Sequence, residues 1–174
     1  MKKTLFIIIT LSSILLGCGV YEPIDIIPDH LQTVRIEPVN NETAQIGIST
    51  ELTRELIDEF IKEGRFTVTS ARDADSVLYT TVAEYSQIPI SYDENFVVQE
   101  YKLTVIANLE FVDNIERVRL WEEQRKGFTG GIEAWVNYSV SPETGFVETE
   151  EEARQRLIRD LAQRILHRTV YGWD

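Results

Sequence analysis

The chain is poor in the residues that most often carry out chemistry in proteins. Its 174 residues include one cysteine, one methionine and two histidines. A single cysteine cannot form a disulfide within the chain, so the fold must depend on its hydrophobic core. The histidines, His30 and His167, do not show metal-ligand spacing, and we expect both to be solvated at the surface. A catalytic centre built on paired cysteines is therefore excluded, and the sequence argues against one built on histidine.

Basic residues are also scarce, with 17 Lys and Arg against 29 Asp and Glu and a formal net charge of −12. Nucleic-acid binding needs clustered basic side chains, so the sequence excludes that class of function. No glycine-rich phosphate-binding motif is present, and no pair of carboxylates has a spacing that indicates an acid and a base. We expect no enzyme activity, no cofactor and no metal.

The N-terminus carries the most informative motif. A basic start, Lys2-Lys3, precedes the apolar stretch Leu5–Leu16, which is shorter than the roughly 20 residues of a membrane-spanning helix. It ends in Leu15-Leu16-Gly17-Cys18, which is typical of a bacterial lipobox. We predict that residues 1–17 are a lipoprotein signal peptide and that Cys18 is the lipidated first residue of the mature protein. An ordinary secretory signal, or a retained N-terminal anchor, is the alternative.

The predicted anchor determines how the rest of the chain is organised. Residues 18–31 contain two prolines and no clear period, so we expect an acylated (palmitate-type) cysteine followed by an extended tether. Residues 32–174 then form a single domain. Loss of the signal peptide, which has two lysines and no acid, takes the net charge from −12 to −14. Gly19, where aspartate would favour inner-membrane retention, points to the outer membrane.

Alternation of apolar and polar residues predicts several strands. The clearest is Val97–Asp113, in which every second residue from Tyr101 to Phe111 is apolar, as in a strand with one buried face. We expect Gly127–Val147 to be a long connection, and Pro89 to stop the strand that precedes it. Shorter strands are predicted at Thr33–Val39, Arg65–Ser70, Val77–Tyr85 and Arg117–Gln124.

Two segments have the apolar period of amphipathic helices. The first begins at Ser49 or Thr50 as its cap and ends near Glu63, with Gly64 just beyond it. The second follows a capping box, Thr149 with Glu152, and runs almost to the C-terminus. Each helix has one face to bury. The predicted fold is therefore α+β: a two-layer sandwich with one mixed or antiparallel sheet of about four to five strands and two helices on one face. The predicted apolar stripes are Leu52, Leu56, Ile57, Phe60 and Ile61, then Ala153, Leu157, Ile158, Leu161, Ile165 and Leu166.

The aromatic residues of the central strands and loops can be core, or can contact a partner, since Tyr and Trp are enriched at binding hot spots. Gln124–Phe128 is the one basic and aromatic stretch in this acidic chain. Both readings stay open from the sequence. The candidate contact residues are Tyr92, Arg125, Lys126, Phe128, Trp135 and Tyr138.

Four stretches together resemble a known family. They are Cys18-Gly19-Val20-Tyr21 after the signal, Ile36–Asn40 leading into a helix with Leu52-Thr53, Ala74–Pro89 (ADSVLYTTVAEYSQIP), and the terminal helix from Glu152 to Trp173. This order resembles the LptE-like lipopolysaccharide-assembly lipoproteins.

The resemblance implies a protein anchored through Cys18 in the inner leaflet of the outer membrane, on the periplasmic side. Such a protein would plug the lumen of the β-barrel LptD, assist its assembly and support lipopolysaccharide transport, without catalytic residues. Lipopolysaccharide is a second implied partner, for which Arg125 and Lys126 are the loop candidates. A lumen lined with basic side chains would suit an acidic plug. The alternative is an unrelated envelope lipoprotein that acts as a scaffold or a secretion-complex subunit.

Overall fold

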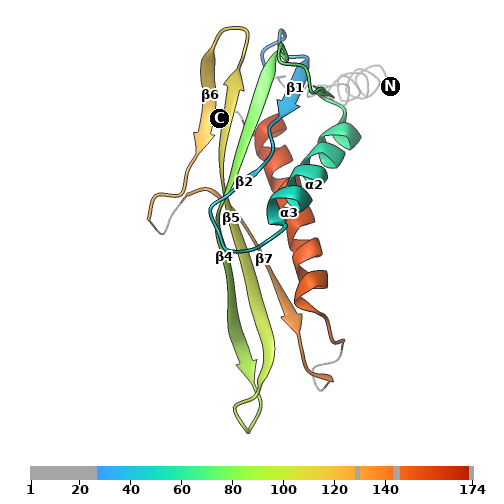
Figure 1. Ribbon diagram of the computed structural model, residues 1–174, viewed down its shortest axis with the longest axis vertical. Helices are drawn as coiled ribbons and strands as arrows, with labels where there is room; N and C mark the ends of the chain where they lie inside the picture. The colour runs from blue at the N-terminus through green and yellow to red at the C-terminus, as the bar shows by residue number, and fades with distance from the viewer. Residues whose placement is uncertain (1–26, 128–129, 143–145, 173–174) are drawn as a thin grey trace, which may run out of the picture.

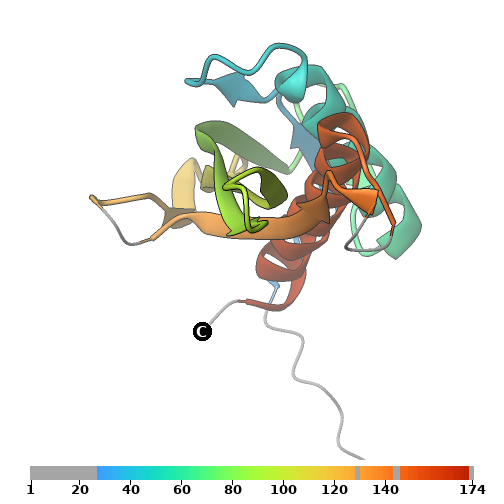
Figure 2. The same cartoon turned by 90° about the horizontal axis from the view of Figure 1, so that it is seen from below.

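The computed structural model describes residues 27–127, 130–142 and 146–172. Two helices, α2 (Ile48–Glu63) and α3 (Glu150–Tyr171), lie on the same side of a curved seven-stranded sheet (Figures 1 and 2). The predicted α+β sandwich is confirmed, with more strands than expected. The strands are β1 (Thr33–Ile36), β2 (Asn40–Asn41), β3 (Thr67–Val68), β4 (Ser76–Tyr92), β5 (Val98–Asp113), β6 (Val118–Glu123) and β7 (Ile132–Ser139).

The two longest strands, β4 and β5, form an antiparallel hairpin at the centre of the sheet. On the far side of β4, the short strands β1 and β2 pair with it in parallel, and β3 pairs in parallel with β1. On the far side of β5, two strands share one edge: β6 pairs with residues 109–113 and β7 with residues 100–107. The sheet is therefore mixed: the pairs among β1, β2, β3 and β4 are parallel, and every pair that includes β5 is antiparallel.

Strand β4 is longer than predicted, because it continues through Pro89 to Tyr92. Proline is tolerated in a strand at an edge or at a β-bulge. Both conditions hold here: β1 and β2 pair with β4 only as far as Val82, and the register with β5 shifts just after Pro89. The prediction that Pro89 stops the strand was wrong.

Strand β7 lies inside the segment predicted to be a connection, so that prediction was also wrong. The side chains of β7 point alternately towards the helices and away from them. Those that point towards the helices belong to residues paired with the inward-facing residues of β5. The period spans only eight residues and follows a glycine pair, which made it easy to miss. The inward residues are Ile132, Ala134, Val136 and Tyr138.

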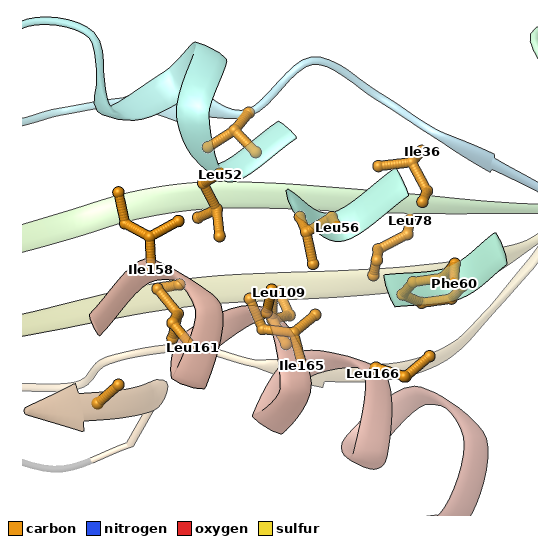
Figure 3. Close-up of a cluster of buried hydrophobic side chains, with 14 of the residues drawn as sticks. Ile36, Leu52, Leu56, Phe60, Leu78, Leu109, Ile158, Leu161, Ile165 and Leu166 are labelled. Atoms are coloured by element: carbon orange, nitrogen blue, oxygen red, sulfur yellow. The ribbon is translucent and has the colours of Figure 1, made fainter. Parts of the chain in front are cut away.

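The core lies between the helices and the inner face of the sheet (Figure 3). The predicted stripe of α3 is buried in full, as are Leu52, Leu56 and Phe60 of α2. Ile61 is exposed, contrary to expectation. The side of α2 that faces the core is the one with Leu52, Leu56 and Phe60, and it is narrower than the apolar sequence pattern suggests. Neither helix in the described ranges has the length and apolar character needed to cross a membrane.

The helix ends confirm part of the capping pattern. Thr149 Oγ1 accepts a hydrogen bond from the Glu152 amide at 3.2 Å, and the Glu152 carboxylate accepts one from the Thr149 amide at 2.9 Å. The hydrogen bonds that the Glu152 carboxylate accepts from the amide and the hydroxyl of Thr149 lower the pKa of Glu152. Gly64 ends α2 in the left-handed conformation, as predicted. The predicted cap of α2 was wrong, because the helix begins at Ile48 after Gly47 and already includes Ser49 and Thr50.

The folded domain starts earlier than residue 32. Ile27 and Leu31 are buried in the core, so the last part of the predicted tether packs against the domain. Asp75 Oδ2 accepts hydrogen bonds from the amides of Gln32 and Thr33, which hold this segment at the start of β4. The signal peptide and Cys18 lie outside the described residues.

Candidate interaction surface

The outer part of the β4–β5 hairpin projects beyond the two helices (Figure 1). The β4 strand loses its neighbours β1 and β2 after Val82, while β5 continues alongside β7 from Ala107 to Glu100. A β-bulge between Val82 and Glu84 shifts the register at the point where these neighbours end. The hairpin thereby becomes an extension of the sandwich, with its connecting turn at one end of the molecule.

The end of this hairpin carries a group of exposed apolar side chains, which we call the hairpin tip. Exposed apolar residues gathered in one place mark interaction sites more often than scattered ones do. Phe96 is the most exposed of them, at 87%. The hairpin tip consists of Ile88, Ile90, Tyr92, Phe96 and Val97.

Hydrogen bonds order the turn that presents Phe96. Asp93 Oδ1 accepts from the amides of Asn95 and Val97, each at 2.8 Å, and the Asp93 amide donates to the Val97 carbonyl at 2.9 Å. Phe96 has a positive φ of 63°, a conformation that is uncommon for a residue with a side chain. The turn thus holds a bulky apolar side chain in solvent at some cost in backbone energy, which favours a contact role for Phe96.

The link between β7 and α3 lies at the same end of the molecule (Figure 1). Val140 donates its amide hydrogen to the Gln99 carbonyl at 3.0 Å, which places the link beside the base of the hairpin turn. Val140, Phe146 and Val147 are exposed, and Phe146 is 81% exposed. These residues enlarge the apolar surface at this end.

Contacts on the inner face join the hairpin to the rest of the domain. Tyr101 and Tyr138 stack with ring centroids 5.7 Å apart, and Gln87 Nε2 donates to Tyr138 Oη. Tyr85 Oη donates to Glu150 at the start of α3, at 2.8 Å. Burial raises the pKa of both Tyr85 and Tyr138 above the ordinary value of a phenol. The projecting hairpin is therefore tied to the helix layer as well as to β7.

The outer face of the sheet is polar and internally paired. Arg125 forms an ion pair with Glu84 across the sheet, and its backbone amide donates to Asn108 Oδ1 at 2.8 Å. Further along this face, Lys102 Nζ lies 4.7 Å from the centroid of the Trp135 ring, within the range of a cation–π contact. Charged side chains on this face already have partners within the protein, whereas the hairpin tip consists of exposed apolar side chains.

The structure separates the six residues that the sequence singled out. Tyr92 belongs to the hairpin tip, and Trp135 is half-exposed on the outer face. Tyr138 is buried in the core against Tyr101, so its predicted contact role is replaced by a structural one. Arg125 and Lys126 follow β6, away from the hairpin turn, and Phe128 lies outside the described residues.

Sequence reasoning missed most of the hairpin tip. Ile88, Ile90 and Val97 were hidden by the expectation that Pro89 ends its strand and that a polar turn follows. Apolar residues on both sides of the polar sequence Asp93–Asn95 were the available signal. This signal does not show that the apolar residues are exposed, because apolar residues in a strand are more often buried.

Fold and surface together define a small α+β domain with an apolar projection. The family model described as LptE, lipopolysaccharide-assembly, matches residues 31–169, and the chain belongs to this family of lipopolysaccharide-assembly lipoproteins.

Two solved structures share the fold at low sequence identity, and a third is similar to the chain at a lower score. A minor lipoprotein from Acinetobacter baumannii has a TM-score of 0.50 at 17% identity, covering 83% of this chain and 95% of that chain. A protein from Xanthomonas campestris has a TM-score of 0.51 at 10% identity, with 79% and 83% covered. Rare lipoprotein B from Shewanella oneidensis has a TM-score of 0.49 at 16% identity, with 79% and 95% covered. A comparison with curated proteins found no match.

Proposed function

We propose that this protein is a non-enzymatic outer-membrane lipoprotein that plugs an LptD-type β-barrel, assists its assembly and so supports lipopolysaccharide transport to the cell surface. The observation that carries the proposal is the β4–β5 hairpin, which projects beyond the helices and ends in exposed apolar side chains. Membership of the lipopolysaccharide-assembly family supports the same pathway.

The form of the hairpin suits entry into a lumen. Beyond the helices the hairpin is flanked by β7 only as far as Glu100, and past that point it is a pair of strands alone. Such a narrow element can insert where a broad domain face cannot, and the ties of Tyr85 and Tyr138 to neighbouring elements limit how far it can bend. A preorganised contact surface loses less conformational entropy on binding. Exposed aromatic side chains such as Tyr92 and Phe96 are the type that most often dominates binding energy.

Charge supports the same kind of partner. The chain has a formal net charge of −12, so it would be attracted to a lumen with basic side chains and repelled by an acidic one. The guanidinium of Arg125 is already paired with Glu84. Of the two proposed partners, the barrel is therefore better supported than direct binding of lipopolysaccharide phosphates through Arg125.

The direct test is affinity purification of the C-terminally tagged, lipidated full chain from detergent-solubilised outer membranes, followed by mass spectrometry. We expect a large β-barrel in about one-to-one proportion with the tagged protein. A set of periplasmic or inner-membrane proteins without a barrel would refute barrel plugging and favour the alternative of a scaffold or secretion-complex subunit. An unrelated tagged lipoprotein from the same membrane controls for incidental capture.

We predict that Cys18→Ser removes the lipid anchor. Each methylene of an acyl chain contributes roughly 0.8 kcal/mol to membrane binding, and stable attachment needs more than one chain. The variant should therefore incorporate no labelled palmitate and should be lost from the outer-membrane fraction. Ser12→Ala, a change in the same segment outside the lipobox, is the matched control. Acylation of the Cys18→Ser chain, or its unchanged recovery from the outer membrane, would contradict the prediction.

A further inference from the structure

Three side chains with metal-ligating atoms meet at the end of the molecule opposite the hairpin tip. Strand β5 runs from the hairpin to Asp113, a length of about 50 Å for its 16 residues. There the Nε2 or Nδ1 atom of His30 and carboxylate oxygens of Asp113 and Glu116 all lie within 4.8 Å of one another. His30 comes from the segment that enters the domain, whereas the two acids flank the start of the β5–β6 turn.

We propose that His30, Asp113 and Glu116 bind a divalent transition-metal ion, with zinc as the test ion, and that the ion fastens the entering segment to the β5–β6 turn. One imidazole and two carboxylates form a mixed nitrogen and oxygen donor set, which suits zinc and its neighbours better than calcium or magnesium. Water would complete the coordination.

Asp113 is positioned as a fixed ligand. Its side chain is only 1% exposed, and its Oδ1 atom accepts hydrogen bonds from the amides of Ile115 at 2.9 Å and Glu116 at 2.8 Å. The other oxygen, Oδ2, is directed at His30. A ligand carboxylate held by hydrogen bonds from its surroundings is the usual second-shell arrangement of a metal site.

His30 and Glu116 can adjust to an ion. The His30 side chain is 36% exposed, and its Nε2 atom lies 2.6 Å from Asp113 Oδ2, joined by a hydrogen bond. Zinc bonds of about 2.0–2.2 Å at a tetrahedral angle need these two atoms a little more than ~3 Å apart, so the ring must move by a fraction of an ångström. The ion would replace the proton shared between them. The Glu116 side chain is exposed and, within the described ranges, makes no hydrogen bond or ion pair that would hold it back.

The neighbouring Asp75 already has a different role. Its Oδ2 atom accepts from the amides of Gln32 and Thr33 at 3.0 and 2.8 Å, so it holds the backbone just after His30. Asp75 and the proposed site would therefore secure two adjacent parts of the same segment. Cys18 lies twelve residues before His30, so an ion bound here would stabilise the domain close to where the predicted tether leaves it.

The experiment uses the lipidated full chain in detergent, purified with a tag that contains no histidine. Zinc chloride is titrated at mildly alkaline pH, because a metal-binding imidazole must be deprotonated. Binding is followed by calorimetry and by the thermal unfolding midpoint, with magnesium chloride in parallel. We expect saturable binding of one zinc ion, an increase of a few degrees in the midpoint, and no comparable effect of magnesium.

Variants locate the bound ion. His30→Gln and Glu116→Gln should each weaken zinc binding by about tenfold or more, while His167→Gln, which changes the only other histidine, should leave it unchanged. Glu116 is exposed, so its variant tests the site even if a change at His30 disturbs the fold. Absence of saturable zinc binding, affinity unchanged by Glu116→Gln, or affinity lost in His167→Gln would each overturn the proposal. None of these outcomes bears on barrel binding, which uses the opposite end of the molecule.

Discussion

Replacing Phe96 by serine should weaken binding to the partner barrel by about 30-fold, which corresponds to about 2 kcal/mol for a hot-spot side chain. Phe96 is 87% exposed at the end of the hairpin, so its ring contributes little to the stability of the free protein and is available to a partner. The measurement is the affinity of the purified variant for the purified barrel in detergent, together with its thermal unfolding midpoint. We expect the affinity to fall and the midpoint to stay within a degree or so.

The matched control is Ile46→Ser. Ile46 is 89% exposed, almost as much as Phe96, but it lies in the turn before α2 and not in the hairpin tip. If Ile46→Ser weakened the barrel complex as much as Phe96→Ser, the effect would reflect general loss of surface hydrophobicity. Unchanged affinity in Phe96→Ser would remove the hairpin tip from the interface.

Phe111→Ala should have the largest effect on stability, lowering the free energy of unfolding by about 3–5 kcal/mol. Phe111 is fully buried on β5, with its ring 5.9 Å from that of Phe66 and 5.5 Å from that of Trp121. Alanine would leave a cavity between β5, β6 and the segment after α2. Because domains of this size are stable by only about 5–15 kcal/mol, the variant should be partly unfolded at modest urea concentrations.

Urea unfolding followed by tryptophan fluorescence measures this change, since Trp121 contacts the altered site. Phe111→Leu, which keeps most of the volume, should cost less than about 1.5 kcal/mol. Phe96→Ala serves as the exposed counterpart and should change the unfolding free energy by no more than about 0.5 kcal/mol. A loss below about 1 kcal/mol in Phe111→Ala would mean that the surrounding side chains close the cavity. We therefore expect changes at Phe111 to affect stability and changes at Phe96 to affect binding.

The charge of Arg125, on the outer face of the sheet, is already paired within the protein. Arg125 was a candidate for an anionic ligand because it lies in the one basic and aromatic stretch of the chain. In the folded protein it pairs with Glu84, from a strand 41 residues earlier. A surface ion pair of this kind contributes little to stability, but it does reduce the charge that Arg125 can offer to a ligand.

Local sequence was sufficient for those elements whose cause is local. The two helices follow from a 3.6-residue apolar period, and the start of α3 follows from Thr149 and Glu152, which bond to each other's backbone amides within one turn. Strand β5 follows from the apolar alternation between Tyr101 and Phe111. The lipobox ending in Cys18 is likewise a local motif, and it remains a prediction from the sequence alone.

Tertiary structure decided what depends on distant partners. Pro89 continues a strand because β4 is an edge there, which depends on where the short strands β1 and β2 end. Strand β7 exists because β5 offers it a free edge beyond β6. His30 meets Asp113 across 83 residues of sequence, and Phe96 is exposed because the helices end short of the hairpin. Periodicity and capping act between residues a few positions apart, so they can be read from the chain. Strand register and burial are set by which remote segment packs alongside, and only the folded molecule determines that.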